Sequence, residues 1–379
     1  MDLTPFKNCL AHKQSIYISN DVHPYKPCCW YKTGIAADNV DDYRAQLASH
    51  DIEKNCAHCI NQESSGATWS HRQLFDKPNE FVLGVCFDNI CNLKCVTCGP
   101  VHTSKLISEW SKLGKLPEAN KRYYVKLMKQ APGKFEFIKT VLDNSEFDIL
   151  RLEIFGGEPL INPTVFEFID WVAEQPYAKN TFLSITSNTT TYTDKIESYC
   201  NKFKNVGLQL SIDGLGDTFE YLRFGAVYQE AVANINQYYE LLDRCPNYSV
   251  AFNYTLSWMN CLHFAEFYKW AADNYPNIHL HLTKLEGPAC YSVNIMSDSQ
   301  RQQITDTVMS QIGTIELGPQ FDKLKDLYQQ SMRYSHNQTA DRSGYKEAIR
   351  SLTQLDDIRL NNFKATFAPI LELIQDEFK

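Results

Sequence analysis

The chain has 379 residues, of which 44% are hydrophobic and 22% charged, a composition typical of a globular protein with two or three domains. A net charge of −8 disfavours a protein that binds long nucleic acids or anionic membranes electrostatically. There is no run of about 18 apolar residues and no basic-then-apolar N-terminal segment, so we expect a cytoplasmic protein without a membrane span.

The first 80 residues are irregular in pattern and contain five of the thirteen cysteines: Cys9, Cys28, Cys29, Cys56 and Cys59. The segment between Cys9 and Cys28 predicts a β-hairpin with its turn near Asn20 and Asp21, which would return the second cysteine close to the first. In a reducing cytosol, such grouped thiols indicate metal binding or catalysis rather than disulfides.

These N-terminal cysteines are numerous enough to form a site with four thiolate ligands. Cys56 and Cys59 are separated by two residues, and Cys9 with Cys28 would complete the set. Cys29 is the alternative to Cys28, because adjacent side chains in an extended segment point to opposite faces. An iron–sulfur cluster and a structural Zn²⁺ both suit four thiolates, so the metal stays open at this point.

From residue 81 the pattern changes to short runs rich in Val, Ile, Leu, Phe or Tyr, separated by amphipathic stretches. Six strands are predicted, at residues 81–87, 150–155, 182–187, 207–212, 250–256 and 278–283. Helices are predicted between them, for example at residues 164–174, 228–243 and 263–274. Alternating strands and helices indicate an α/β fold with a parallel sheet, here an open, partial (β/α)6 barrel of the TIM type.

Three regions follow from these patterns: a cysteine-rich module at residues 1–80, the partial barrel at residues 81–290, and a helical C-terminal extension at residues 291–379. In the extension, the amphipathic stretches 299–311 and 360–375 are expected to form helices that pack on the outside of the barrel. Covering the substrate is the alternative role. The remaining cysteines, Cys86, Cys200, Cys245, Cys261 and Cys290, are expected to be packed or buried as small apolar residues.

Polar or glycine motifs follow four of the predicted strands. In a barrel of this type, functional residues gather in the loops after the carboxyl ends of the strands. In strand order, the motifs are Cys91, Cys95 and Cys98; Gly156-Gly157-Glu158-Pro159; Ser187-Asn188; and Ser211 with Asp213. Packing alone does not account for four such strand ends.

The three cysteines of C-N-L-K-C-V-T-C predict an iron–sulfur cluster, since its irons prefer thiolate ligands. A cubane cluster has four irons, so three cysteines would leave one iron open to a ligand that is not protein. An open position is typical of catalytic rather than structural metal sites. The alternatives are three buried thiols, or a zinc site with a distant fourth ligand.

This C-x3-C-x2-C motif resembles the signature of the radical S-adenosylmethionine (SAM) superfamily, and the resemblance covers residues 81–290, including the G-G-E-P that follows the second strand. It implies a [4Fe–4S] cluster whose open iron binds the amino and carboxylate groups of SAM. One electron from the cluster would split SAM into methionine and a 5′-deoxyadenosyl radical, which abstracts hydrogen from a substrate.

The resemblance also implies SAM contacts at the other strand ends. Gly156 and Gly157 would let the backbone approach a ligand, and Glu158 would accept from the SAM ammonium. In residues 210–223, Ser211 and Arg223 are expected to contact the SAM carboxylate, for which the planar guanidinium is suited. Asn188 and Asp213 are further candidates. Many members carry an aromatic residue after the third cysteine, where this chain has Gly99, so no adenine contact is assigned.

The N-terminal cysteines resemble a twitch or SPASM-like module, which implies an auxiliary [4Fe–4S] cluster, with zinc as the alternative. Residues 59–72 and 355–367 fit the same resemblance, so that it spans almost the whole chain. It implies a peptide or small protein as substrate and an external one-electron donor such as flavodoxin or ferredoxin. Two alternatives remain: the same chemistry on a nucleoside or small metabolite, and a non-catalytic iron–sulfur or zinc protein.

Overall fold

The computed structural model describes residues 9–21, 24–37, 39–64, 70–313, 319–333 and 340–378. Its centre is one eight-stranded sheet with the strand order β2-β1-β3-β4-β5-β6-β7-β8. The strands are β1 Ser15–Ile18, β2 Tyr25–Lys26, β3 Glu80–Val85, β4 Ile149–Ile154, β5 Thr181–Ser187, β6 Asn205–Ser211, β7 Tyr248–Leu256 and β8 His279–Lys284. All neighbours pair in parallel except β1 and β2. The mixed α/β fold and all six predicted strands are thus confirmed.

Helices follow the strands of the sheet. Before β4 lie α2 Ala11–Gln14, α3 Val40–Ala48, α4 Ile52–Asn55, α5 Ala57–Ser64, α6 Leu106–Lys112, α7 Glu118–Leu127 and α8 Ala131–Asp143. Between β4 and β8 lie α9 Pro163–Ala173, α10 Lys195–Cys200, α11 Gly216–Leu222, α12 Tyr228–Tyr239, α13 Leu241–Arg244 and α14 Phe264–Asn274. The single helix expected at residues 228–243 is two helices, α12 and α13, which meet at Glu240.

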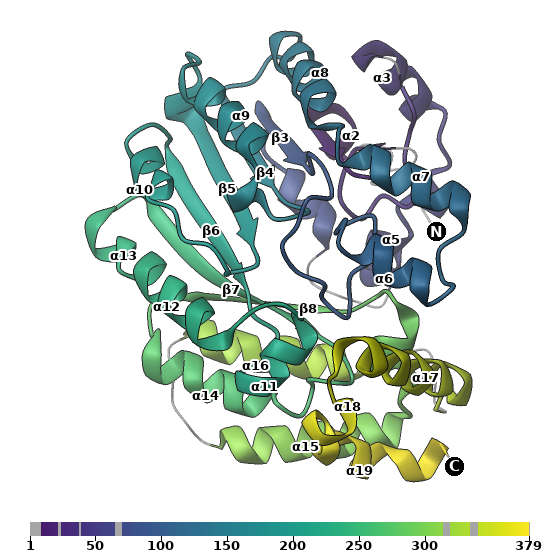
Figure 1. Cartoon of the computed structure of the whole chain (residues 1–379). Helices are drawn as coiled ribbons and strands as arrows, with labels where there is room; N and C mark the ends of the chain where they lie inside the picture. Colours follow the sequence, from purple (N-terminus) through teal and green to yellow (C-terminus); the bar gives the residue numbers. More distant parts are fainter. Residues whose placement is uncertain are drawn as a thin grey trace.

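The two faces of the sheet differ in burial. Along β4, β5 and β6, buried residues alternate with half-buried ones, as the period of two along a strand requires. Apolar residues such as Leu152, Ile185 and Leu208 fill one face. Figure 1 shows helices α10, α12 and α13 on one side of the strands and α5 on the other. The half-buried face, on the side away from α12, carries polar side chains.

The expected N-terminal hairpin is confirmed by the antiparallel pair β1 and β2. Its first strand also pairs in parallel with β3, which the sequence did not predict, so the hairpin belongs to the same sheet as the strands that follow it. Lys134 of α8 fixes this junction. Its buried Nζ donates to Asn20 Oδ1 at 2.7 Å and to the carbonyl oxygens of Ser19 and Cys86, at 3.0 and 2.6 Å.

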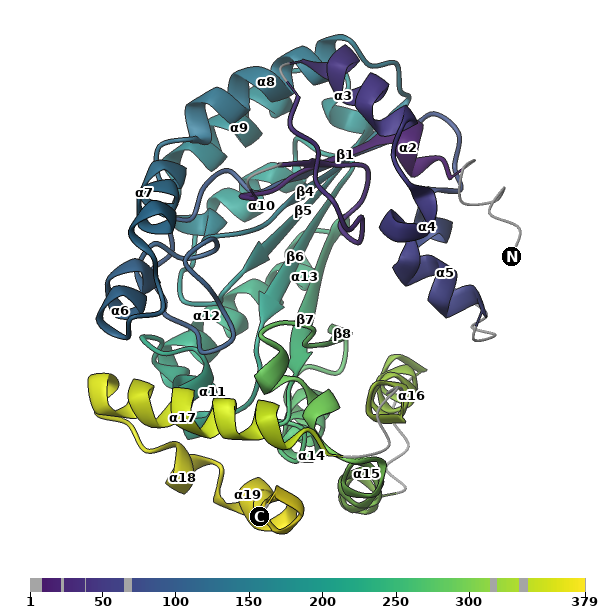
Figure 2. The same cartoon turned by 90° about the vertical axis from the view of Figure 1, so that its right-hand side faces the viewer.

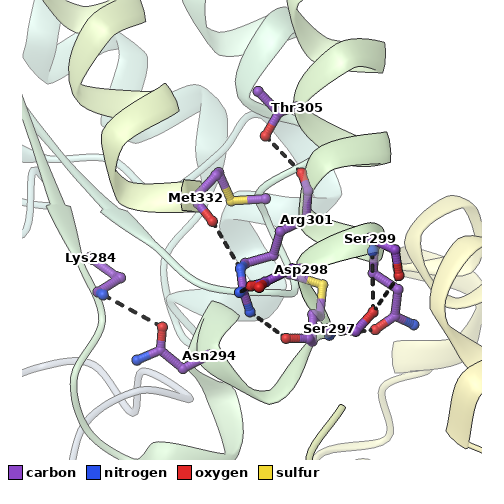
Figure 3. Close-up of polar contacts among 10 residues, drawn as sticks. Lys284, Asn294, Ser297, Asp298, Ser299, Arg301, Thr305 and Met332 are labelled. Atoms are coloured by element: carbon purple, nitrogen blue, oxygen red, sulfur yellow. Dashed lines mark hydrogen bonds and ion pairs between the residues drawn. The ribbon is translucent and has the colours of Figure 1, made fainter. Parts of the chain in front are cut away.

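The C-terminal extension is helical, as expected. It contains α15 Asp298–Ile312, α16 Pro319–Arg333, α17 Arg342–Arg359, α18 Phe363–Thr366 and α19 Ala368–Phe378. Arg301 fixes the first two of these helices together. Figure 3 shows its guanidinium beside Asp298 and donating to the carbonyl oxygen of Met332 at 2.8 Å. Leu360, the expected start of an amphipathic stretch, instead caps α17 in the left-handed conformation.

Helix α17 lies beyond the ends of the strands in both views (Figures 1 and 2). Asp356 of this helix accepts from Tyr221 Oη of α11 at 2.8 Å. Lys115, which follows α6, donates to Ser351 Oγ at 3.0 Å. Helix α17 therefore contacts segments that follow the carboxyl ends of β3 and β6. Within the described residues, no helix is long and apolar enough to span a membrane.

Candidate functional site

Cys91, Cys95 and Cys98 lie on one loop between β3 and α6, each partly buried. The thiols of Cys95 and Cys98 share a hydrogen bond, which raises the pKa of Cys95 and lowers that of Cys98. Burial raises the pKa of Cys91 to about 11, although Leu93 N donates to its Sγ at 3.4 Å. Cys95 and Cys98 are therefore in direct contact, and Cys91 lies on the same loop.

Two backbone hydrogen bonds attach the cysteine loop to the end of α11. Lys94 N donates to Phe224 O at 2.9 Å, and Val96 N donates to Leu222 O at 2.8 Å. Arg223, the residue between these two acceptors, is thereby fixed beside the thiols. Its positive charge favours the thiolate forms of Cys95 and Cys98 and acts to lower their pKa values.

Arg223 is only 8% exposed and pairs with Asp213, with Nη2 at 2.7 Å from Oδ2. Asp213 Oδ1 accepts from Thr255 N at 2.9 Å. The Nε of Arg223 is buried and has no hydrogen-bond partner among the described residues. Leaving a buried donor unpaired costs about 1–3 kcal/mol, so this atom indicates a place for an acceptor such as a carboxylate.

Gly156 and Gly157 follow β4 with φ of 78° and 56°, a region that disfavours side chains. A Cβ on Gly156 would overlap Cys86 Sγ, and one on Gly157 would overlap the carbonyl oxygen of Ile90. Glu158 N donates to the same Ile90 oxygen at 2.8 Å. The close approach that these glycines allow is therefore to the segment that leads into the cysteine loop.

Glu158 is 1% exposed, and its carboxylate accepts three hydrogen bonds from the protein. Oε1 accepts from Leu160 N at 3.0 Å and from Ser187 Oγ at 2.9 Å, while Oε2 accepts from Asn188 N at 2.6 Å. The side chain thus joins the ends of β4 and β5. Burial raises the pKa of this carboxyl to about 7, against the effect of its three donors.

The raised pKa of Glu158 predicts a pH dependence of stability. The folded state holds this proton up to about pH 7 and the unfolded chain loses it near 4.5, so the free energy of unfolding should fall as pH rises between these values. We expect this residue to contribute a loss of about 3 kcal/mol over that interval. Urea unfolding of the wild type and Glu158→Gln from pH 4.5 to 7.5 measures it. Parallel pH profiles would contradict the assignment.

Asn188 follows β5 and lies beside the first cysteine. Its Nδ2 is 3.7 Å from Cys91 Sγ and donates to Asn92 Oδ1 at 2.8 Å. Thr190 completes this network, since Asn92 Nδ2 donates to its Oγ1 at 2.7 Å. Neither Asn92 nor Thr190 is indicated as a site residue by the sequence. Asn92 stands at a variable position of the cysteine motif, and nothing in the sequence near Thr190 indicates a link to that loop.

Ser211 ends β6 and lies in register with Asn253 of β7, on the half-buried face of the sheet. The aromatic residue that the sequence lacks at position 99 has a spatial counterpart. The ring of Trp110 on α6 lies 3.6 Å from the point where a Cβ of Gly99 would be. Trp110 was missed because it stands eleven residues after Gly99, on the following helix.

The N-terminal cysteines form a second group. A small cavity of about 20 Å³ is lined by Cys9, Cys28, Cys56 and Cys59, together with His12, Trp30 and His58. Cys29 is not part of this lining. Burial raises the pKa values of Cys9, Cys28 and Cys56, and the neighbouring cysteines raise them further. His12 Nε2 lies 3.9 Å from Cys56 Sγ.

No disulfide bond is found among the described residues. Cys86, Cys200, Cys245, Cys261 and Cys290 are buried, as expected for packed side chains. In the part of the chain that the structure describes, no three His, Cys, Asp or Glu side chains converge closely enough to form a metal-binding group. The donor types in both cysteine groups nevertheless fit iron or zinc, which prefer thiolates.

Two residues distant in sequence meet beside the cysteine loop. Arg359 of α17 donates to both carboxylate oxygens of Glu109 on α6, from Nη2 to Oε1 at 2.6 Å and from Nε to Oε2 at 3.1 Å. Lys94 Nζ lies 3.4 Å from the same carboxylate. The guanidinium also lies over the ring of Phe224, 4.6 Å from its centroid. No sequence signal connects Arg359 with Glu109, which stands 250 residues earlier.

No family model matches this chain, and no curated protein matches it. Among solved structures, it resembles anSMEcpe with bound AdoMet and a Cp18Cys peptide, at 14% identity and a TM-score of 0.40, over 61% of this chain and 59% of that one. Streptococcus suis SuiB bound to S-adenosylmethionine aligns at 13% identity and a TM-score of 0.39, over 75% of this chain and 56% of that one. TYW1 with a lysine–pyruvate adduct bound aligns at 15% identity and a TM-score of 0.29, over 58% of this chain and 69% of that one. The chain thus spans less than two thirds of anSMEcpe and SuiB.

Proposed function

We propose that this protein is a radical SAM enzyme that cleaves SAM reductively and acts on a peptide or small protein. The observation that carries the proposal is a loop with three cysteines that is fixed beside a buried arginine. Cys91, Cys95 and Cys98 would hold a [4Fe–4S] cluster, and the unpaired Nε of Arg223 lies on the segment bonded to their loop. Such a donor suits the carboxylate of SAM.

The other residues at the carboxyl edge of the sheet would complete the SAM site. Gly156, Gly157 and Glu158 would offer backbone carbonyl groups to the ammonium, because the Glu158 carboxylate already accepts three protein donors. Asn188 and Ser211 would supply polar contacts, and Asp213 would orient Arg223. Trp110 would provide the aromatic surface that Gly99 lacks. A bound cluster would supply the electron that splits SAM.

An auxiliary [4Fe–4S] cluster on Cys9, Cys28, Cys56 and Cys59 is the second part of the proposal, with Zn²⁺ as the alternative. The cavity that these four cysteines line supports it, and the absence of Cys29 from that lining favours Cys28 as the ligand. The sequential order of the parallel strands β3 to β8 supports the partial (β/α)6 barrel. An external one-electron donor in the cytoplasm would complete the system.

The test is to purify and reconstitute the protein anaerobically and to measure SAM binding and 5′-deoxyadenosine formation with dithionite. Bound SAM and its cleavage product would support the proposal. A sample loaded with cluster that neither binds nor cleaves SAM would contradict it and favour the non-catalytic iron–sulfur alternative. Iron and zinc analysis then assigns the second site. About eight irons indicate two clusters, and about four irons with one zinc indicate a structural zinc.

A further inference from the structure

The half-buried face of the sheet contains a cavity of about 190 Å³, far larger than the 10–15 Å³ or so that one water needs. Residues of five neighbouring strands, β4 to β8, line it. His279 and His281 on the edge strand β8 belong to this lining, and both residues are partly accessible to solvent, so the cavity can be reached from outside. It lies on the amino-terminal side of Ser211 in the strand direction.

Strand register explains why the cavity exists. Glu153, Ser184, Gly207 and Ser249 are successive partners across β4, β5, β6 and β7 and therefore form one row on this face. A barrel interior is normally filled by bulky branched side chains in such rows. Here a glycine and two serines leave room. A Cβ on Gly207 would lie 3.3 Å from Ser249 Oγ and 3.9 Å from Ser184 Oγ.

Glu153 is the carboxylate of this row. Within the described residues, it makes one side-chain hydrogen bond, from Tyr17 Oη to Oε2 at 2.7 Å, and no ion pair. The nearby Arg151 forms its ion pair with Glu80 instead. Burial raises the pKa of the Glu153 carboxyl, against the effects of Tyr17 and Arg151. A cation brought beside it would favour the ionised form and gain a charge-assisted hydrogen bond.

The polar groups around Gly207 are suited to a donor with several hydrogens. Glu153 can accept only, and the hydroxyls of Ser184 and Ser249 can accept as well as donate. Burial lowers the pKa of His281, with His279 and Lys323 adding to the effect, so this ring is uncharged near neutral pH and does not repel a cation. A primary ammonium has three donors and one positive charge, and thus matches this set.

We propose that this row is a substrate subsite that binds a primary ammonium group, such as that of a lysine side chain, between Glu153 and the two serine hydroxyls. Ser211 lies four residues beyond Gly207 on the same strand, about 13 Å along it. The row thus lies on the same strand as one end of the proposed SAM site, on its amino-terminal side. The assignment of this ammonium to a substrate rests on the proposed function, whereas the binding of an ammonium at the row does not.

The test measures binding of small probes to the full chain by ligand-observed NMR, without SAM or reductant. The probes are Nα-acetyl-lysine amide, its uncharged analogue Nα-acetyl-norleucine amide, and the free diamine cadaverine. Glu153→Gln removes the charge and Gly207→Val fills the cavity. The matched controls are Asp170→Asn, which removes a carboxylate on the outer surface, and Gly133→Val, where an added side chain meets no atom within 4 Å.

We expect the wild type and both controls to bind the lysine derivative about tenfold more tightly than the norleucine derivative. Glu153→Gln and Gly207→Val should lose that preference while their melting temperatures show that they fold. Tighter binding of the lysine derivative than of cadaverine would indicate an ammonium carried by a peptide, and the reverse a free diamine; either supports the subsite. Equal binding of charged and uncharged probes, no binding, or an unchanged Glu153→Gln variant would overturn it. Failure of SAM cleavage alone would overturn only the proposed function.

Discussion

Replacing Cys91, Cys95 and Cys98 together with alanine is expected to remove about four irons per chain and to abolish 5′-deoxyadenosine formation. The reason is that these three thiols are the proposed ligands of the cluster, on one loop that is fixed through Lys94 and Val96 to the segment of Arg223. Iron and sulfide analysis of anaerobically reconstituted protein, followed by chromatography of the SAM products, measures both effects.

The scattered cysteines provide the control for this experiment. Cys245, Cys261 and Cys290 are buried free thiols that we assign to packing alone. Their triple alanine variant has the same number of thiols as the loop variant and should keep the iron content and the activity of the wild type. Iron loss of equal size in both triple variants, or none in the loop variant, would contradict the assignment of the cluster to the loop.

Replacing Arg359 with methionine is expected to destabilise the protein by about 3–5 kcal/mol, because it leaves the Glu109 carboxylate buried without its main partner. Both side chains are only 2% exposed, and Lys94 Nζ lies 3.4 Å from that carboxylate. Lys94 lies between Cys91 and Cys95. The variant should therefore also loosen the cysteine loop and retain less iron. Urea unfolding and iron analysis of the reconstituted protein measure the two effects.

A second substitution distinguishes the effect of losing the arginine side chain from the effect of leaving the Glu109 carboxylate unpaired. Adding Glu109→Leu to Arg359→Met removes the unpaired carboxylate and should recover most of the lost stability, since buried ion pairs can often be replaced by apolar residues. Arg244→Met breaks an ion pair with Glu197, 3.0 Å apart, on the exposed surface and should change stability little. A double variant as unstable as Arg359→Met would show that Glu109 does not cause the loss.

The thiol groups illustrate how far a local pattern can lead. Spacing alone predicts that Cys91, Cys95 and Cys98 act together, and the structure places all three on one loop, with a thiol hydrogen bond between Cys95 and Cys98. The hairpin between Cys9 and Cys28 followed equally from a short pattern, and β1 and β2 form it. Neither pattern could predict that β1 would pair with β3, whose residues stand more than sixty positions later.

The glycine motif shows the limit of such reasoning. The position after a strand suggested a close backbone approach at Gly156 and Gly157, and both have positive φ. The sequence did not reveal that the two glycines lie against Cys86 Sγ and the carbonyl oxygen of Ile90. Nor did it reveal that the Glu158 carboxylate accepts from donors at the end of β5. A side chain's partners depend on which strands are neighbours and in what register, and this information is not local.

The sequence by itself determined the order of strands and helices, the parallel sheet and the grouping of the cysteines, because periodicity and short spacings act within one element or loop. Only the tertiary structure decided that Arg359 pairs with Glu109, that Arg223 Nε is buried without a partner among the described residues, and that small residues of three strands form one row with Glu153. Each of these features joins residues from different elements. Each feature depends on the burial of its side chains or on the register of neighbouring strands, and both are set only once the sheet has formed.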